Sequence, residues 1–122
     1  MASILIVEDD PLVRNSLRFI IEAGGHVVTE AEDGSVALKA PLADYDLVIT
    51  DILMPEVSGI EVIRALRALP APPPIIAMSG GNRLDGDDPL EVALASGALV
   101  AMRKPFSAKD LMAAVSRCLA PS

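Results

Sequence analysis

The sequence has almost no cysteine or histidine and no long apolar run, and these absences exclude several classes of protein. The single cysteine, Cys118, cannot form a disulfide within the chain, and the single histidine, His26, has no partner at a spacing suited to zinc. Hydrophobic residues make up 52% of the chain, yet no apolar run approaches the ~18 residues of a membrane span. The N-terminus turns acidic at Glu8, too early for a signal peptide. We expect a cytoplasmic protein without membrane contact.

Positive charge is also scarce. Ten lysines and arginines face 17 acids, so the formal net charge is −7, which argues against direct binding to nucleic acid or anionic membranes. No repeat, low-complexity tail or interdomain linker interrupts the 122 residues. We therefore expect a single domain over residues 1–122, large enough to bury a core, whose partner is a protein or a small molecule.

The sequence does contain a regular alternation of short apolar runs and helical patterns. The runs are apolar throughout instead of alternating with polar residues, which predicts strands that are buried on both faces. The expected strands are Ile4–Val7, Val27–Thr29, Leu47–Thr50, Ile75–Met78 and Leu99–Met102. Five such strands separated by helices indicate an α/β protein in which a five-stranded parallel sheet has helices on both faces.

Capping residues mark where four of the helices begin. Asp10 and Asp88 each precede a proline, and Ser58 begins the pattern of a capping box. The expected caps are therefore Asp10, Ser58, Asp88 and Ser107. The second helix is expected over residues 35–42, where Pro41 would break or shorten it.

Few topologies fit five such units, because crossovers between parallel strands are right-handed almost without exception. The flavodoxin-like strand order 2-1-3-4-5 is a common solution for doubly wound sheets. Ligands of these sheets bind beyond the carboxyl ends of the strands, where the winding direction reverses. For this order, the binding crevice lies between the first and third strands.

Polar residues stand at these carboxyl ends. The first strand is followed by Glu8 and Asp9, the third by Asp51 and the fourth by Ser79, while the fifth leads to Lys104. If three carboxylates come within ~5 Å, each pair repels by roughly 3 kcal/mol at an effective dielectric constant of about 20. Either raised pKa values or a cation must compensate, and hard oxygen ligands in an open cleft suit Mg²⁺.

Each of these residues also has an ordinary structural interpretation. Asp10 is expected only to cap a helix, and Glu8 and Asp9 could be solvated loop charges. Ser79 could be a turn residue, and Lys104 could be a solvated surface charge. The expectation of a site depends on the placement of all these groups at one edge of one sheet.

The motifs at these positions resemble the receiver domain of two-component response regulators. They are ILIVEDDP at the first strand, VITDILMPEVSG at the third, PPIIAMSG at the fourth and RKPF after the fifth. Each motif is weak alone, but four in this order on a five-unit pattern are specific, and the resemblance covers essentially the whole chain. It implies the receiver fold of the CheY-like superfamily.

The resemblance implies a role for each polar residue. Asp51 would accept a phosphoryl group, Ser79 would hydrogen-bond that group, and Lys104 would pair with it. The implied Mg²⁺ ligands are Glu8, Asp9, Asp51 and the backbone carbonyl of Leu53. The protein would catalyse only its own phosphorylation and dephosphorylation, without turning over an outside substrate.

The implied partners are proteins. A sensor histidine kinase or a phosphotransfer protein would supply the phosphoryl group. A downstream protein would bind the face formed by the fourth helix, fifth strand and fifth helix. The sequence departs from the family pattern at two places. Ala101 stands where the family usually has an aromatic residue, three positions before the lysine, and the loop over residues 80–89 is longer than is common. We expect this loop to be the main site of conformational change.

Two other functions remain open. A pseudo-receiver would keep the fold as a protein-binding module without being phosphorylated. Ala101 leaves room for that alternative, while the complete set of Glu8, Asp9, Asp51, Ser79 and Lys104 argues against it. A metal-dependent phosphatase with an aspartyl-phosphate intermediate would carry an acid at the position of Leu53, so the sequence disfavours it.

Overall fold

The computed structural model describes residues 2–80 and 88–120 and has the predicted α/β architecture. Its five parallel strands lie in the order β2-β1-β3-β4-β5, which confirms the predicted topology. The strands are β1 (Ser3–Val7), β2 (Val27–Ala31), β3 (Leu47–Asp51), β4 (Ile75–Ser79) and β5 (Val100–Arg103).

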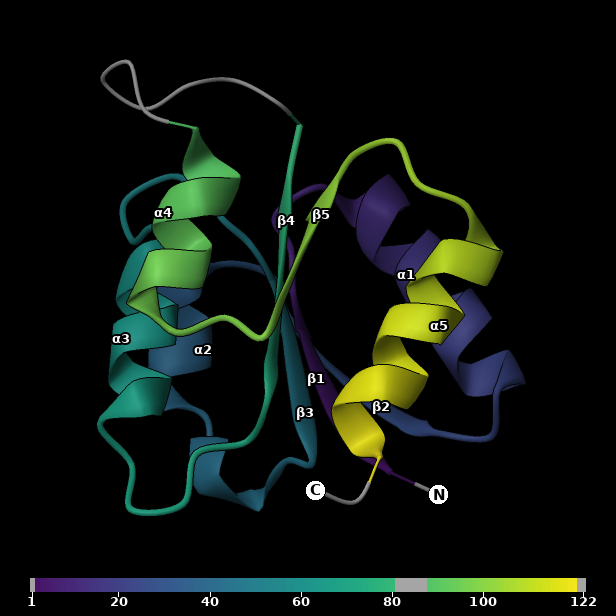
Figure 1. Cartoon of the computed structure of the whole chain (residues 1–122), viewed down its shortest axis with the longest axis horizontal. Helices are drawn as coiled ribbons and strands as arrows, with labels where there is room; N and C mark the ends of the chain where they lie inside the picture. Colours follow the sequence, from purple (N-terminus) through teal and green to yellow (C-terminus); the bar gives the residue numbers. More distant parts are fainter. Residues whose placement is uncertain (1, 81–87, 121–122) are drawn as a thin grey trace.

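Helices cover both faces of the sheet. They are α1 (Pro11–Ala23), α2 (Gly34–Lys39), α3 (Gly59–Arg67), α4 (Pro89–Ser96) and α5 (Ala108–Leu119). Figure 1 shows the sheet between two layers, with α2, α3 and α4 on one face and α1 and α5 on the other. The two faces bury separate apolar clusters. In the described part of the chain, no helix has both the length and the apolar character needed to cross a membrane.

The four predicted helix caps are confirmed. The side chain of each capping residue accepts a hydrogen bond from a backbone N–H in the first turn, which satisfies a donor that the helix itself leaves unpaired. The capping box is complete, since the Glu61 side chain also accepts from the Ser58 backbone. These caps fix where α1, α3, α4 and α5 begin, and therefore where the preceding loops end.

The second helix begins one residue before its expected range and ends three residues before the end of that range, which confirms that Pro41 shortens it. The helix α2 begins at Gly34, because Asp33 and not a later residue caps it. It ends at Lys39, and Pro41 then precedes a short 3₁₀ turn over Leu42–Asp44. Proline has no N–H and cannot continue the helical ladder, so the helix stops before it.

Four strands end further along the chain than predicted, which changes where two of the site residues lie. The sequence predicts that β3 and β4 end before Asp51 and Ser79, but each is the last residue of its strand. The strands β2 and β5 likewise extend beyond their predicted ends. Backbone hydrogen bonding continues past the apolar run, as the bond from the Ile52 amide to the Met78 carbonyl shows (3.0 Å). The side chains of Asp51 and Ser79 are thus carried by the ends of strands and not by loops.

Candidate functional site

Three carboxylates meet where β1 and β3 end. Glu8 and Asp9 directly follow β1, and Asp51 closes β3, the neighbouring strand in the sheet. One carboxylate oxygen from each of the three lies within 4.8 Å of the others. The predicted convergence of these acids at one edge of the sheet is therefore confirmed.

Two of the three acids are buried, and burial changes their protonation. The exposed fraction is 1% for Glu8 and 6% for Asp51, whereas Asp9 is exposed to solvent. Burial raises the pKa of Glu8 to about 7, although the hydrogen bond from Lys104 opposes this shift. Burial also raises the pKa of Asp51. Glu8 and Asp51 therefore hold protons more tightly than solvent-exposed acids do, because burial disfavours their charged forms.

Lys104 is the cation that faces this cluster. Its Nζ lies 2.7 Å from Glu8 Oε1 and 3.6 Å from Asp51 Oδ2. Burial acts to lower the pKa of Lys104, but its contacts with Glu8 and Asp51 outweigh that effect and raise it. Lys104 is thus a charged partner that is shared unequally between the two buried acids, with the shorter contact to Glu8.

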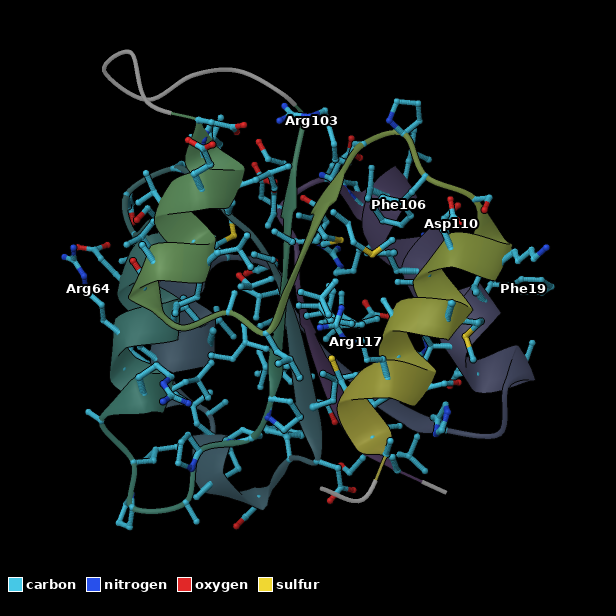
Figure 2. The ribbon with its side chains drawn as sticks, in the orientation of Figure 1. Phe19, Arg64, Arg103, Phe106, Asp110 and Arg117 are labelled. Atoms are coloured by element: carbon cyan, nitrogen blue, oxygen red, sulfur yellow. The ribbon has the colours of Figure 1, made fainter. Side chains whose placement is uncertain are left out.

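The loop that carries Lys104 is held on both sides. The Lys104 amide donates to the Ser79 carbonyl (2.8 Å), and the peptide bond to Pro105 is cis. On one side, Arg103 pairs with Asp88 at the start of α4 (2.8 Å). On the other side, Phe106 packs against the apolar cluster under α1 and α5. Figure 2 shows Arg103 and Phe106 at the end of the sheet where the site lies.

The remaining site predictions have different outcomes. Ser79 is buried at the end of β4, beside the strand that carries Asp51, so its position at the same sheet edge is confirmed. Asp10 caps α1 through its Oδ1 (2.9 Å to the Leu12 amide), as expected. The role of the Leu53 carbonyl stays a prediction. Much of the loop over residues 80–89 lies outside the described residues, so its expected movement stays a prediction as well.

Sequence reasoning missed Arg14. Its Nη1 donates to the backbone carbonyl of Glu8 (2.8 Å), and its Nε donates to Glu30 Oε2 (3.1 Å). Glu30 lies on β2, and its carboxylate pairs with two arginines of α1 and does not belong to the acidic cluster. The only available signal was the position of Arg14 one turn after the Asp10 cap, which indicates a side chain near the loop between β1 and α1.

The donor set fits a hard divalent cation. Three carboxylates contribute oxygen ligands, one of them open to solvent, and the burial of the other two makes an added positive charge favourable. Mg²⁺ usually takes one or two carboxylates together with water and phosphate oxygens. The cluster is therefore typical of a Mg²⁺ site.

Comparison with known proteins assigns the family. The chain matches the response regulator receiver domain family over residues 4–116. It is 38% identical over 120 residues to the transcriptional regulatory protein FixJ of Azorhizobium caulinodans, covering 96% of this chain and 54% of that protein. FixJ of Bradyrhizobium diazoefficiens is 34% identical over 118 residues, with 95% and 56% covered. The chain thus spans about half the length of the curated relatives it matches.

Solved structures agree with this assignment. The chemotaxis response regulator CheY4 of Vibrio cholerae superimposes with a TM-score of 0.83 at 28% identity, covering 98% of this chain and 99% of that one. A structure of FixJ-N gives a TM-score of 0.84 at 27% identity, with 98% and 94% covered. The chain therefore belongs to the response regulator receiver domains, the CheY-like, non-enzymatic signalling modules of two-component systems.

Proposed function

We propose that the protein is a phosphorylation-dependent switch that accepts a phosphoryl group on Asp51 from a sensor histidine kinase or a phosphotransfer protein. The observation that carries this proposal is the placement of Asp51 at the end of β3, next to two further acids and 3.6 Å from the ammonium group of Lys104. Phosphorylation would alter the face formed by α4, β5 and α5 and thereby change the binding of a downstream protein.

The orientation of Asp51 supports its role as the phosphoacceptor. Its Oδ1 accepts a hydrogen bond from the Ile52 amide (3.0 Å), which fixes the carboxylate plane. Its Oδ2 is the oxygen that faces Lys104. In the transfer, Oδ2 forms a bond to phosphorus, and the leaving group of the phosphodonor departs with the electron pair of the broken bond. The product is an acyl phosphate, which water can hydrolyse back to the carboxylate.

The neighbouring groups would offset the charge of the phosphoryl oxygens. Lys104 would pair with one oxygen and Ser79 would donate a hydrogen bond to another, as preorganised donors in a partly buried site. Glu8, Asp9, Asp51 and the Leu53 carbonyl would hold Mg²⁺, which when bound neutralises phosphoryl charge and orients the transferring group. Lys104 must then exchange its 2.7 Å contact with Glu8 for the phosphoryl group.

Incubation with Mg²⁺ and acetyl phosphate is expected to add one phosphoryl group to the protein, detected by intact mass. The Asp51→Asn variant is expected to gain none, because an amide cannot replace the attacking carboxylate. Asp10→Asn is the matched control. It replaces a carboxylate that lies near the site but only caps α1, so the variant should be phosphorylated like the wild type. An unmodified wild type would favour the pseudo-receiver alternative, and equal modification of Asp51→Asn would contradict the assignment of Asp51.

Lys104→Met is expected to strengthen Mg²⁺ binding at about pH 8.5 by about tenfold, because a cation that competes for the same carboxylates is removed. The alkaline pH matters, since loss of Lys104 raises the pKa of Glu8 further and a protonated Glu8 cannot bind metal. Isothermal titration with Mg²⁺ measures the affinity. Weaker binding by the variant would show that Lys104 holds the acids in place for the metal instead of competing with it.

A further inference from the structure

Every polar atom of Glu8 has a bonding partner. Its amide donates to the Ala31 carbonyl on β2 (3.1 Å), and its carbonyl accepts from Arg14 Nη1 (2.8 Å). Its Oε1 accepts from Lys104 Nζ (2.7 Å), and its Oε2 accepts from the Asp10 amide (3.3 Å). Binding of a metal by the Glu8 carboxylate competes with the two side-chain contacts, but it leaves the two backbone contacts intact.

Of the two hydrogen bonds to the Glu8 backbone, one comes from a side chain, that of Arg14. Its guanidinium links two segments, since Nη1 donates to the Glu8 carbonyl just after β1 and Nε donates to Glu30 on β2. The side chain is only 16% exposed. The forked, planar guanidinium can serve both acceptors at once, which a lysine ammonium on a flexible stem does less well.

Glu30 holds this arginine in position. Its Oε2 accepts from Arg14, and its Oε1 accepts from Arg18 Nη1 (2.8 Å), so each carboxylate oxygen has its own arginine. These hydrogen bonds, first among them that from Arg18, lower the pKa of Glu30 and keep it ionised. Glu30 also neutralises much of the charge of Arg14. The arginine can therefore hold the Glu8 backbone while repelling a bound cation only weakly.

We infer that Arg14 is a positioning residue for the metal site, acting through the Glu8 backbone and anchored by Glu30. The inference rests on the proposed function, because it concerns the affinity of the same acidic cluster for Mg²⁺. Arg14 fixes the peptide that follows β1, which carries Glu8 and Asp9, two of the three acids that would hold the metal. Residues that orient metal ligands in this way commonly contribute about 10-fold to 100-fold to metal affinity.

Geometry and simple electrostatics predict opposite results for one substitution. Arg14→Met removes a positive charge near a cation site and leaves Glu30 less neutralised, so charge alone predicts tighter Mg²⁺ binding. Loss of the hydrogen bond to the Glu8 carbonyl predicts weaker binding, because the ligand-bearing peptide loses an anchor. The sign of the change therefore identifies the role of Arg14.

The test is isothermal titration of the full chain with Mg²⁺ alone, at about pH 8 to keep Glu8 ionised. Arg14→Met is expected to weaken binding by about tenfold or more. Arg14→Lys keeps the charge and is expected to weaken binding to a smaller extent, because an ammonium cannot serve both acceptors in the same way. Arg18→Met is the matched control: Arg18 lies one turn further along α1 and shares Glu30, but its described bonds go to Glu22 and Glu30, so Mg²⁺ affinity should not change.

Thermal unfolding without Mg²⁺ accompanies each titration, and Arg14→Met should remain folded, since Glu30 keeps its contact with Arg18. Unchanged or tighter binding by Arg14→Met, or an equal loss in Arg18→Met, would overturn the inference while leaving the proposed function intact. A wild type that binds no Mg²⁺ would overturn both. If Arg14→Met does not fold, Arg14→Lys decides, and wild-type affinity in that variant would overturn the inference.

Discussion

Lowering the pH from about 7 to about 5 is expected to weaken Mg²⁺ binding by about 50-fold, because Glu8 must lose a proton before it can bind the metal. Burial raises the pKa of Glu8 to about 7, so about half of the Glu8 side chains are ionised at pH 7 and about one in a hundred at pH 5. The raised pKa of Asp51 acts in the same direction. Isothermal titration with Mg²⁺ at several pH values measures the effect, and an affinity that does not depend on pH would contradict the carboxylate assignment.

The same shift predicts how the stability of the metal-free protein depends on pH. The pKa of Glu8 is higher in the folded protein than its ordinary value of 4.5, so the folded state binds this proton more tightly than the unfolded state. The resulting contribution, on the order of 3 kcal/mol, is present below about pH 4.5 and is lost as the pH rises to about 7. Urea unfolding measures it, and Glu8→Gln, which does not titrate, should lack it. Saturating Mg²⁺ should abolish or reverse the trend.

Gly59→Ala is expected to lower the free energy of unfolding by about 3 kcal/mol and to impair phosphorylation. Gly59 is buried at the first position of α3, and its amide donates to the Ile52 carbonyl (2.8 Å). An added Cβ would lie 2.7 Å from Ile52 Cα and closer still to the Asp51 carbonyl oxygen. Both are backbone atoms that cannot rotate away, so the end of β3 or the start of α3 must shift, and Asp51 shifts with it.

Gly80→Ala is the matched control for this substitution. Among the described residues, an added Cβ at Gly80 meets no atom within 4 Å, so the same chemical change meets no steric conflict with them. Alanine has the higher intrinsic helix propensity, so without the steric conflict Gly59→Ala would be neutral or stabilising. Urea unfolding of the two variants measures the difference, and equal stabilities would show that the packing of α3 against β3 is looser than described.

Much of the fold follows from the sequence for physical reasons. Uninterrupted apolar runs form strands only where both faces of a sheet are covered, and the carboxyl ends of parallel strands must share one edge. These two rules suffice to bring Glu8, Asp9 and Asp51 together, as the structure does. The strand ends are less predictable, because backbone pairing continues through polar residues such as Asp51 and Ser79 wherever a neighbouring strand offers partners.

The contact between Arg14 and Glu8 could not be predicted in the same way. It depends on the rotation of α1 about its axis, which packing against the sheet determines, and on the pairing of Arg14 with Glu30. The unequal sharing of Lys104 between Glu8 and Asp51 likewise depends on side-chain positions at sub-ångström precision. Sequence patterns therefore indicate which residues meet, while the structure shows how they are held.

The most direct measurement of the central claim is chemical mapping of the phosphorylated residue. Treatment of the protein with Mg²⁺ and acetyl phosphate, followed by borohydride, reduces an aspartyl phosphate to homoserine, which tandem mass spectrometry locates in the sequence. We predict homoserine at position 51 alone, in a yield that depends on Mg²⁺. Homoserine at Asp9 or Asp10 in its place, or none at any position, would contradict the assignment of Asp51 as the phosphoacceptor.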